Sequence, residues 1–223
     1  MTDVTLRAVL FVDTGGALER SLRIVFLVVF IALAVIAVPP AGGRLANLAE
    51  LRLRWAPAIL GALGIQIVIV AVLPDGVPTL HRVLHVASYA LAAAFLVANR
   101  RLAGSHLIGL GALCNLIAIL ANNGVMPASA AALRAAGLPA TSRGFRNSTY
   151  LAHARIQLLG DIFAIPKRWP FHNVFSIGDI CIVLGITITI HTVANSRLAL
   201  HRHGARRAAR LSHGDRSSEE TRH

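Results

Sequence analysis

The sequence predicts an all-α protein: a polytopic bundle of about five membrane-spanning helices. Of the 223 residues, 55% are hydrophobic and 14% are charged, whereas soluble domains carry about 25% charged residues. The charges also avoid five long apolar runs, and a helix crossing a ~30 Å hydrocarbon core needs about 20 mostly apolar residues. These observations favour a membrane bundle over one soluble domain of the same length.

The transmembrane domain is expected over residues 22–195. Its predicted spans lie near residues 22–38, 56–73, 83–98, 102–121 and 177–194. Pro74 closes the second run, and Asn122, Asn123 and Gly124 end the fourth, because Asn and Gly tolerate the left-handed conformation that caps a helix. The first and third runs are short, and flanking arginines extend them by snorkelling to the interface.

Residues 1–21 form a polar N-terminal extension. A cleaved signal peptide over residues 1–43 is the competing interpretation, since Arg20 and Arg23 precede the apolar stretch. The region before that stretch is long for a signal peptide. Both interpretations stay open at this point.

The loop 122–176 between the last two spans is predicted to be partly helical. Its Ala128–Ala136 stretch is rich in alanine and predicts a short helix, followed by a polar turn region over Gly137–Thr149. Residues 151–165 are apolar but too short to span, which favours an interfacial or re-entrant segment. Trp169, beside Lys167 and Arg168, is typical of an interfacial anchor.

Arginines near the helix ends predict the orientation. They cluster in the first loop, at Arg100 and Arg101, and in the tail 196–223. Positive residues are retained on the cytoplasmic side, so the N-terminus is expected outside and the C-terminus in the cytoplasm. The net charge of +12 therefore has a cause other than nucleic-acid binding, which is not expected. The tail is expected to be disordered and is suited to anionic lipid headgroups.

The sequence contains no recognisable catalytic motif. Phosphate-binding loops, zinc-ligand spacings and nucleophile motifs are all missing, so no cofactor, metal site or catalytic residue is predicted, and the chain is not expected to be an enzyme. Cys114 and Cys181 lie in apolar runs and are expected to be packing residues. The sequence does not determine a protein partner or an oligomeric state.

Asp179 is the most informative single residue. An ionisable residue in a spanning helix is a functional candidate. Ser176 and Asp179, however, also match a capping box, in which each side chain would accept from the other residue's backbone N–H. A functional carboxylate and a helix cap would have the same sequence at this position, so both alternatives stay open.

Further polar residues define two candidate groups. Asp161 shares the local string Gly-Asp-Ile with Asp179, and two carboxylates on the outer face would suit a cation or a proton. The outer group comprises Asn122, Asn123, Met126, Pro127, Asp161, Ser176 and Asp179, and the intramembrane group comprises Gln66, His85, Asn115 and His191. Asn115 and Asn122 are seven apart and hence on one helix face. The alternative for all of them is interhelical hydrogen bonding.

Several of these residues together resemble the bacterial membrane proteins of domain-of-unknown-function family 5317. The motifs that carry the resemblance are Gly42-Gly43-Arg44-Leu45, Asn122-Asn123-Gly124-Val125-Met126-Pro127, Leu158-Leu159-Gly160-Asp161-Ile162, Ile165-Pro166 and Phe175-Ser176-Ile177-Gly178-Asp179. The resemblance covers roughly residues 22–195, and Ala128 departs from the Val that usually follows Met-Pro. It implies a small multi-pass protein of the bacterial inner membrane, and it brings no catalytic residues.

Three functions are compatible with the sequence. The favoured one is membrane-embedded binding, transport or sensing, with a polar site on the outer face. The second is a structural or accessory subunit that holds a partner through faces of small residues. The third and least favoured is an intramembrane enzyme with His153 or Asp161 as base, because no nucleophile or metal set accompanies them.

Overall fold

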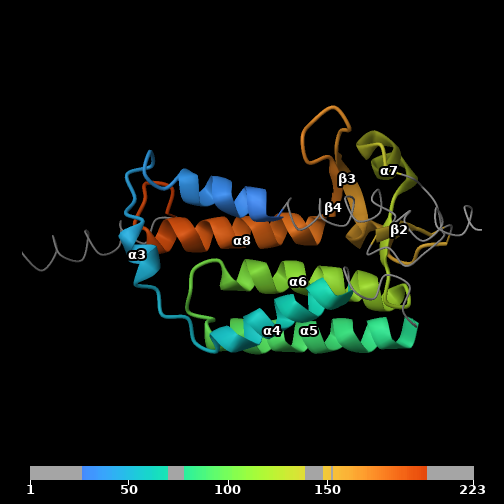
Figure 1. Cartoon of the computed structure of the whole chain (residues 1–223), viewed down its shortest axis with the longest axis horizontal. Coiled ribbons are helices and arrows are strands. Elements are labelled where there is room, and N and C mark those ends of the chain that lie inside the picture. Colours follow the sequence, from blue (N-terminus) through green and yellow to red (C-terminus); the bar gives the residue numbers. More distant parts are fainter. Residues whose placement is uncertain (1–26, 70–77, 139–147, 152, 200–223) are drawn as a thin grey trace, which may run out of the picture.

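The computed structural model describes residues 27–69, 78–138, 148–151 and 153–199. Helices make up most of this part, and the long ones run side by side with a small sheet at one end (Figure 1). The helices are Leu27–Ile36, α3 (Ala46–Ala49), α4 (Ala56–Ile67), α5 (Pro78–Ala98), α6 (Ser105–Ala121), α7 (Ala130–Ala136), the 3₁₀ helix η2 (Gln157–Leu159) and α8 (Ile177–Val193). The strands are β1 (Met126–Ala128), β2 (Ser148–Tyr150), β3 (Asp161–Ile165) and β4 (Asn173–Ser176).

Each of the five predicted apolar runs contains a helix, but the helices differ from the predicted spans in length. Among the described helices, only α5 is long and apolar enough to cross a membrane, over Thr79–Ala98, and 17% of its most apolar window is buried. The other four have 10–17 residues. The fold is therefore mostly helical, and helix length does not confirm five spans.

Parts of the predicted organisation lie outside the described residues. These parts are the extension 1–21, residues 22–26 of the first predicted span, residues 70–73 of the second, most of the turn region (139–147) and the tail from residue 200 onward. The third predicted span is longer than expected, because α5 begins at Pro78 instead of Val83. Proline suits the first turn of a helix, where its missing N–H leaves no bond unmade.

The most extensive helix contact joins α6 and α8. Glycines allow it at two levels: Gly104 lies against the Gly185 carbonyl, and Gly111 lies against the Gly178 carbonyl. A Cβ at Gly104 or Gly111 would collide with these backbone oxygens. Gly178 and Gly185 are seven residues apart and so share one face of α8, while Gly104 is the N-cap of α6 and Gly111 lies within it; these small residues bring the helix backbones together.

Three segments meet at one end of the bundle, which we call the arginine-rich end. They are residues 41–55, 99–104 and 194–199. The Arg44 N–H donates to the Ala194 carbonyl (2.9 Å). Asn99 Nδ2 donates to the Arg54 carbonyl (2.7 Å), and Asn99 Oδ1 accepts from the Arg54 N–H (3.0 Å). The described parts of the segments that the charge pattern predicts on one side of a membrane thus lie at one end of the molecule.

The opposite end, formed by the described residues between 122 and 176, is called the sheet end (Figure 1). Its sheet has the strand order β2-β1-β3-β4. β1 runs parallel to β2 and β3, and β3 runs antiparallel to β4. α7 packs on the sheet through a small apolar core that includes Leu133 and Val174. Through β1 and β4, the sheet joins the long loop to α6 and α8.

The sequence predicted one element of the sheet end and missed another. The alanine-rich stretch forms α7 as expected, with Ser129 Oγ accepting from the Ala132 N–H (3.0 Å) and Gly137 ending the helix at φ 68°. The sheet is a correction to the all-α expectation. Residues 151–165, expected to be interfacial or re-entrant, contain η2 and strand β3; their depth in a membrane stays a prediction.

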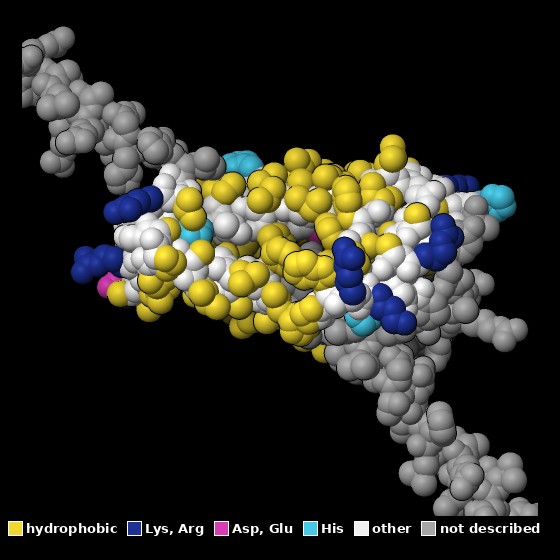
Figure 2. Space-filling view, turned by 90° about the horizontal axis from the view of Figure 1, so that it is seen from above, with side chains coloured by type: hydrophobic (Ala, Val, Ile, Leu, Met, Phe, Trp, Pro, Cys, Tyr) yellow, Lys and Arg dark blue, Asp and Glu magenta, His cyan; other side chains and the backbone are white. Residues whose placement is uncertain are grey.

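Hydrophobic side chains dominate the flank between the two ends. Figure 2 shows this flank, with Lys and Arg side chains gathered at either end of it. Apolar side chains are also exposed on α5, which lies at the bottom of the view in Figure 1: Val83 and Val97 are 59% and 65% exposed. Acidic side-chain atoms are visible at the bottom of a recess in the same flank.

Candidate functional site

The start of α8 carries a closed group of hydrogen bonds. Ser176 and Asp179 form the predicted capping box: Ser176 Oγ accepts from the Asp179 N–H (3.0 Å), and Asp179 Oδ2 accepts from the Ser176 N–H (2.9 Å). Asn115 on α6 completes the group. Its Nδ2 donates to Asp179 Oδ1 (2.8 Å), and its Oδ1 accepts from Ser176 Oγ (2.8 Å). The capping role of Asp179 is therefore confirmed, and the same carboxylate also joins α8 to α6.

Gly178 makes this group geometrically feasible. A Cβ on Gly178 would collide with Asn115 Oδ1 and would lie 2.7 Å from the Gly111 carbonyl. Any larger residue would push Asn115 away from Ser176 and Asp179. The glycine contact between the helices and the hydrogen-bond group are thus one structural unit.

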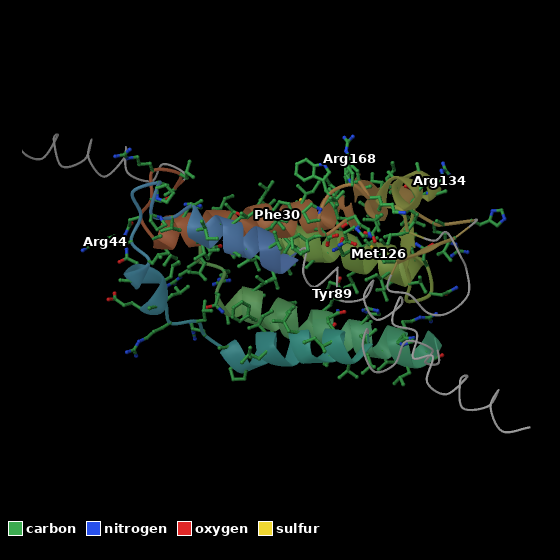
Figure 3. All side chains as sticks on the ribbon, turned by 45° about the horizontal axis from the view of Figure 1, so that its top comes forward. Phe30, Arg44, Tyr89, Met126, Arg134 and Arg168 are labelled. Carbon is green, nitrogen blue, oxygen red and sulfur yellow. The ribbon has the colours of Figure 1, made fainter. Side chains whose placement is uncertain are left out.

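Asp161, the second carboxylate, lies close to the first. It is buried in β3 and stands opposite Ser176 in the β3–β4 pair. Tyr89 on α5 lies near enough to both Asp161 and Asp179 for their charges to act on its hydroxyl. Tyr89 also packs against the small cluster that contains Met126 (Figure 3). α5, α6, α8 and the sheet therefore each bring a polar group to one region.

His85 lies one turn before Tyr89 on α5. The side chain is 1% exposed, and neither ring nitrogen has a hydrogen-bond partner among the described residues. Its backbone carbonyl accepts from Ser88 Oγ (2.9 Å), to which Gln66 Nε2 also donates (2.7 Å). A buried polar group without a partner costs about 1–3 kcal/mol, and in a native protein it calls for an explanation. Among the described residues, neither hydrogen-bonding nitrogen of His85 is used.

Asn122 has a structural task. It is buried at the end of α6, and its Nδ2 donates to the carbonyls of Ala118 and Arg155 (both 2.8 Å). Its Oδ1 accepts from the Arg155 N–H (2.8 Å). Through these bonds, Asn122 fixes the long loop to the end of α6.

The other predicted residues divide between the two ends. Asn123 is exposed and its Oδ1 accepts from Arg82 Nη2 (3.1 Å), while Met126 and Pro127 are buried in β1. His191 lies far from them, at the arginine-rich end, where its Nδ1 hydrogen-bonds Ser196 Oγ (2.7 Å). The structure therefore groups Asn115, Asp161, Ser176 and Asp179, and it leaves His191 outside that group.

Two residues with a structural role carry no strong signal in the sequence. Tyr89, near the two aspartates, is one of several polar residues in the third apolar run, and Asn99, which binds the Arg54 backbone, simply follows that run. Helical spacing offers a signal for the first, since His85 and Tyr89 are four residues apart and share a face. Within the described residues, no three His, Cys, Asp or Glu side chains are arranged to hold a metal ion.

The family model of DUF5317, a family of unknown function, matches residues 50–191. This match covers more than half of the chain, so the chain belongs to that family. No curated protein and no solved structure is significantly similar to it. The family confirms the predicted resemblance and assigns no activity.

Proposed function

We propose that this DUF5317 member is an integral membrane protein with five spanning helices. The five apolar helices, the hydrophobic flank and the basic residues at its two ends support this arrangement. α6 and α8 have 17 residues each, which at about 1.5 Å per residue reach ~25 Å. That length is at the lower limit of the range for spanning helices, about 17–25 residues.

The proposed orientation has the arginine-rich end in the cytoplasm and the sheet end outside. The retention of positive loops on the cytoplasmic side supports it. Reporter fusions at Leu138 and His223 test it: an externally active reporter at Leu138 and a cytoplasmic one at His223 are expected. A cytoplasmic signal at Leu138 would contradict the topology.

At the sheet end, the protein binds a small cation, the proton included, for transport or sensing. The observation that carries this proposal is that Asp179 is held by hydrogen bonds and has no cationic side chain paired with it among the described residues. Its oxygens accept hydrogen bonds from Asn115 and Ser176, and no Lys or Arg of the described residues forms an ion pair with it. Ionisable groups in such surroundings are costly and mark ion or proton sites. Asp161 and Tyr89 lie in the same region, and His85, one turn before Tyr89, has no hydrogen-bond partner among the described residues.

The test uses the full-length protein in nanodiscs. Its Tm is measured with sodium, potassium, magnesium or calcium at constant ionic strength, and from mildly acidic to neutral pH. One of these conditions should raise the Tm of the wild type, since a ligand at 100 times its Kd adds about 2.7 kcal/mol. Asp161→Asn and Asp179→Asn should abolish that rise.

Glu50→Gln is the matched control, because Glu50 is an exposed carboxylate at the arginine-rich end. It should respond as the wild type does. If both aspartate variants also respond to every cation and every pH as the wild type does, the cation-binding function is wrong.

The accessory-subunit alternative rests on faces of small residues. Gly111, Gly178 and Gly185 are used inside the chain between α6 and α8, and only Gly64 among the described glycines of the long helices faces open space. This distribution gives the alternative less support than the sequence suggested. The enzyme alternative gains no support from His153, because this residue is exposed in the long loop.

A further inference from the structure

The turn between β3 and β4, residues 166–172, presents aromatic and basic side chains together. We call it the hairpin tip. Trp169 and Phe171 are 60% and 44% exposed, and Lys167 and Arg168 are exposed beside them. Exposed aromatic residues next to positive charges are the composition of interfacial membrane anchors.

The hairpin tip is held in place by its neighbours. The Lys167 N–H donates to the Ala135 carbonyl of α7 (3.0 Å), and the Trp169 N–H donates to the Pro166 carbonyl (2.9 Å). The Lys167 stem also packs so closely on Gly137 that a Cβ there would lie 2.5 Å from Lys167 Cδ. Exposure of the aromatic residues is therefore a property of the fold and is not due to a loose loop.

Phe171 adds a second indication. Its φ is +64°, a left-handed conformation that costs a residue with a Cβ roughly 1–2 kcal/mol relative to its usual conformations and that glycine adopts freely. Its ring is exposed, so it gains little from packing against the protein. A bulky apolar side chain in a strained, exposed position is expected where the ring contacts something outside the chain.

The charge around the hairpin tip has one sign. Arg134, in the last turn of α7, projects from the same side of the sheet end as Arg168 (Figure 3). Arg155 is also exposed at this end, and the acidic residue in the described part of the sheet end, Asp161, is buried. An anionic, partly apolar surface is the complement of this combination.

We infer that the hairpin tip binds the headgroups of anionic phospholipids, with Lys167 and Arg168 on the phosphates and Trp169 and Phe171 at the level of the upper acyl chains. A positive residue near an anionic bilayer contributes about fivefold in affinity. This inference rests on the membrane placement proposed above, because the tip must lie at the bilayer surface. It adds a lipid preference that a five-span bundle does not require.

Fluorescence of the full chain in nanodiscs tests the inference. The chain has two tryptophans, so Trp55→Phe leaves Trp169 as the reporter. In mixtures of phosphatidylcholine and phosphatidylglycerol, one lipid at a time carries bromine as quencher. Brominated phosphatidylglycerol should quench Trp169 more strongly than brominated phosphatidylcholine at equal mole fraction. The ratio should fall by up to about fivefold for each of Lys167→Gln and Arg168→Gln.

Arg52→Gln, at the arginine-rich end, is the matched control and should leave the ratio unchanged. Equal quenching by the two lipids, or a Trp169 that only aqueous acrylamide quenches, would overturn the inference. So would a stronger response of Trp169 to an oligonucleotide than to phosphatidylglycerol. Extraction of cell membranes with alkaline carbonate separates the two failures: a chain released by carbonate contradicts the membrane placement, whereas a retained chain with an aqueous Trp169 contradicts the lipid site alone.

Discussion

Asn99 and Asn122 close opposite ends of the bundle by the same means. Each follows a long helix and donates to the carbonyl four residues earlier, at Phe95 and Ala118 (both 2.8 Å). Each also holds the backbone N–H and carbonyl of one loop arginine, Arg54 or Arg155. One buried amide is therefore sufficient to fasten a loop to a helix end in this protein.

The surroundings of the two amides differ in charge. At the arginine-rich end, the described buried polar contacts involve no carboxylate, as in the bond between His191 and Ser196, and Glu50 is exposed. At the sheet end, Asp161 and Asp179 lie together, and His85, one turn before Tyr89, is buried with no hydrogen-bond partner among the described residues. Since loop closure needs only the amide, the additional charge at the sheet end indicates a function.

The largest expected effect on stability tests the loop fastening by a buried amide that the two ends share. Asn99→Ala and Asn122→Ala each leave a part-buried backbone N–H and carbonyl of a loop arginine without their partner, which should lower the free energy of unfolding by about 2–4 kcal/mol. The measurement is unfolding in denaturing detergent. Losses that differ by more than a factor of two between the variants would show that the amides are not equivalent.

The next effect tests the connection between the ends. Gly111→Ala places a Cβ against the Gly178 carbonyl, so overpacking should cost about 1–3 kcal/mol. Gly64→Ala is the matched control, because nothing lies within 4 Å of the added Cβ. It should stabilise α4 by up to about 1 kcal/mol. Equal effects of the two substitutions would contradict the close α6–α8 contact.

A smaller effect concerns the support of the sheet end. Ser129→Ala removes the side-chain cap of α7 and should cost about 1 kcal/mol. Ser129→Asp should retain most of the stability, since Asp also caps helix starts well. Thermal unfolding of the two variants checks this order. If Ser129→Ala leaves the Tm unchanged, the cap does not stabilise α7 and only its packing on the sheet does.

The smallest expected effect on stability separates structure from function. His85→Leu replaces a buried imidazole that has no hydrogen-bond partner among the described residues by an apolar side chain, so the free energy of unfolding should stay the same or rise. The cation response of the Tm should weaken at the same time. A large loss of stability would show that His85 serves the fold, and an unchanged cation response would remove it from the site.

The sequence predicted local features well. Ser176 and Asp179 are three residues apart, and the cap they form depends only on that spacing. The end of α6 was predictable for the same reason, because it depends only on the adjacent residues Asn122, Asn123 and Gly124. The five apolar runs were also found, because an apolar helix is visible in composition alone.

Features that depend on distant pairs were not predictable. The sheet pairs Ala128 with Asp161 and Asp161 with Ser176, and strands β1 and β2 are only three residues long, too short for a periodic signal. The bond between Asn115 and Asp179 likewise requires that α6 and α8 approach at Gly111 and Gly178. Residue types suggested these candidates, and only the packing of the helices shows which of them meet.

Hydrogen exchange of the full-length protein tests the central claim most directly. Exchange of backbone amides is compared by mass spectrometry with and without the cation that raises the Tm. Protection should increase in peptides covering residues 115–127 and 158–180, and it should stay unchanged in residues 41–55, 99–104 and 194–199, because a ligand suppresses local opening where it binds. Equal protection at both ends, or protection confined to the arginine-rich end, would contradict a cation site at the sheet end.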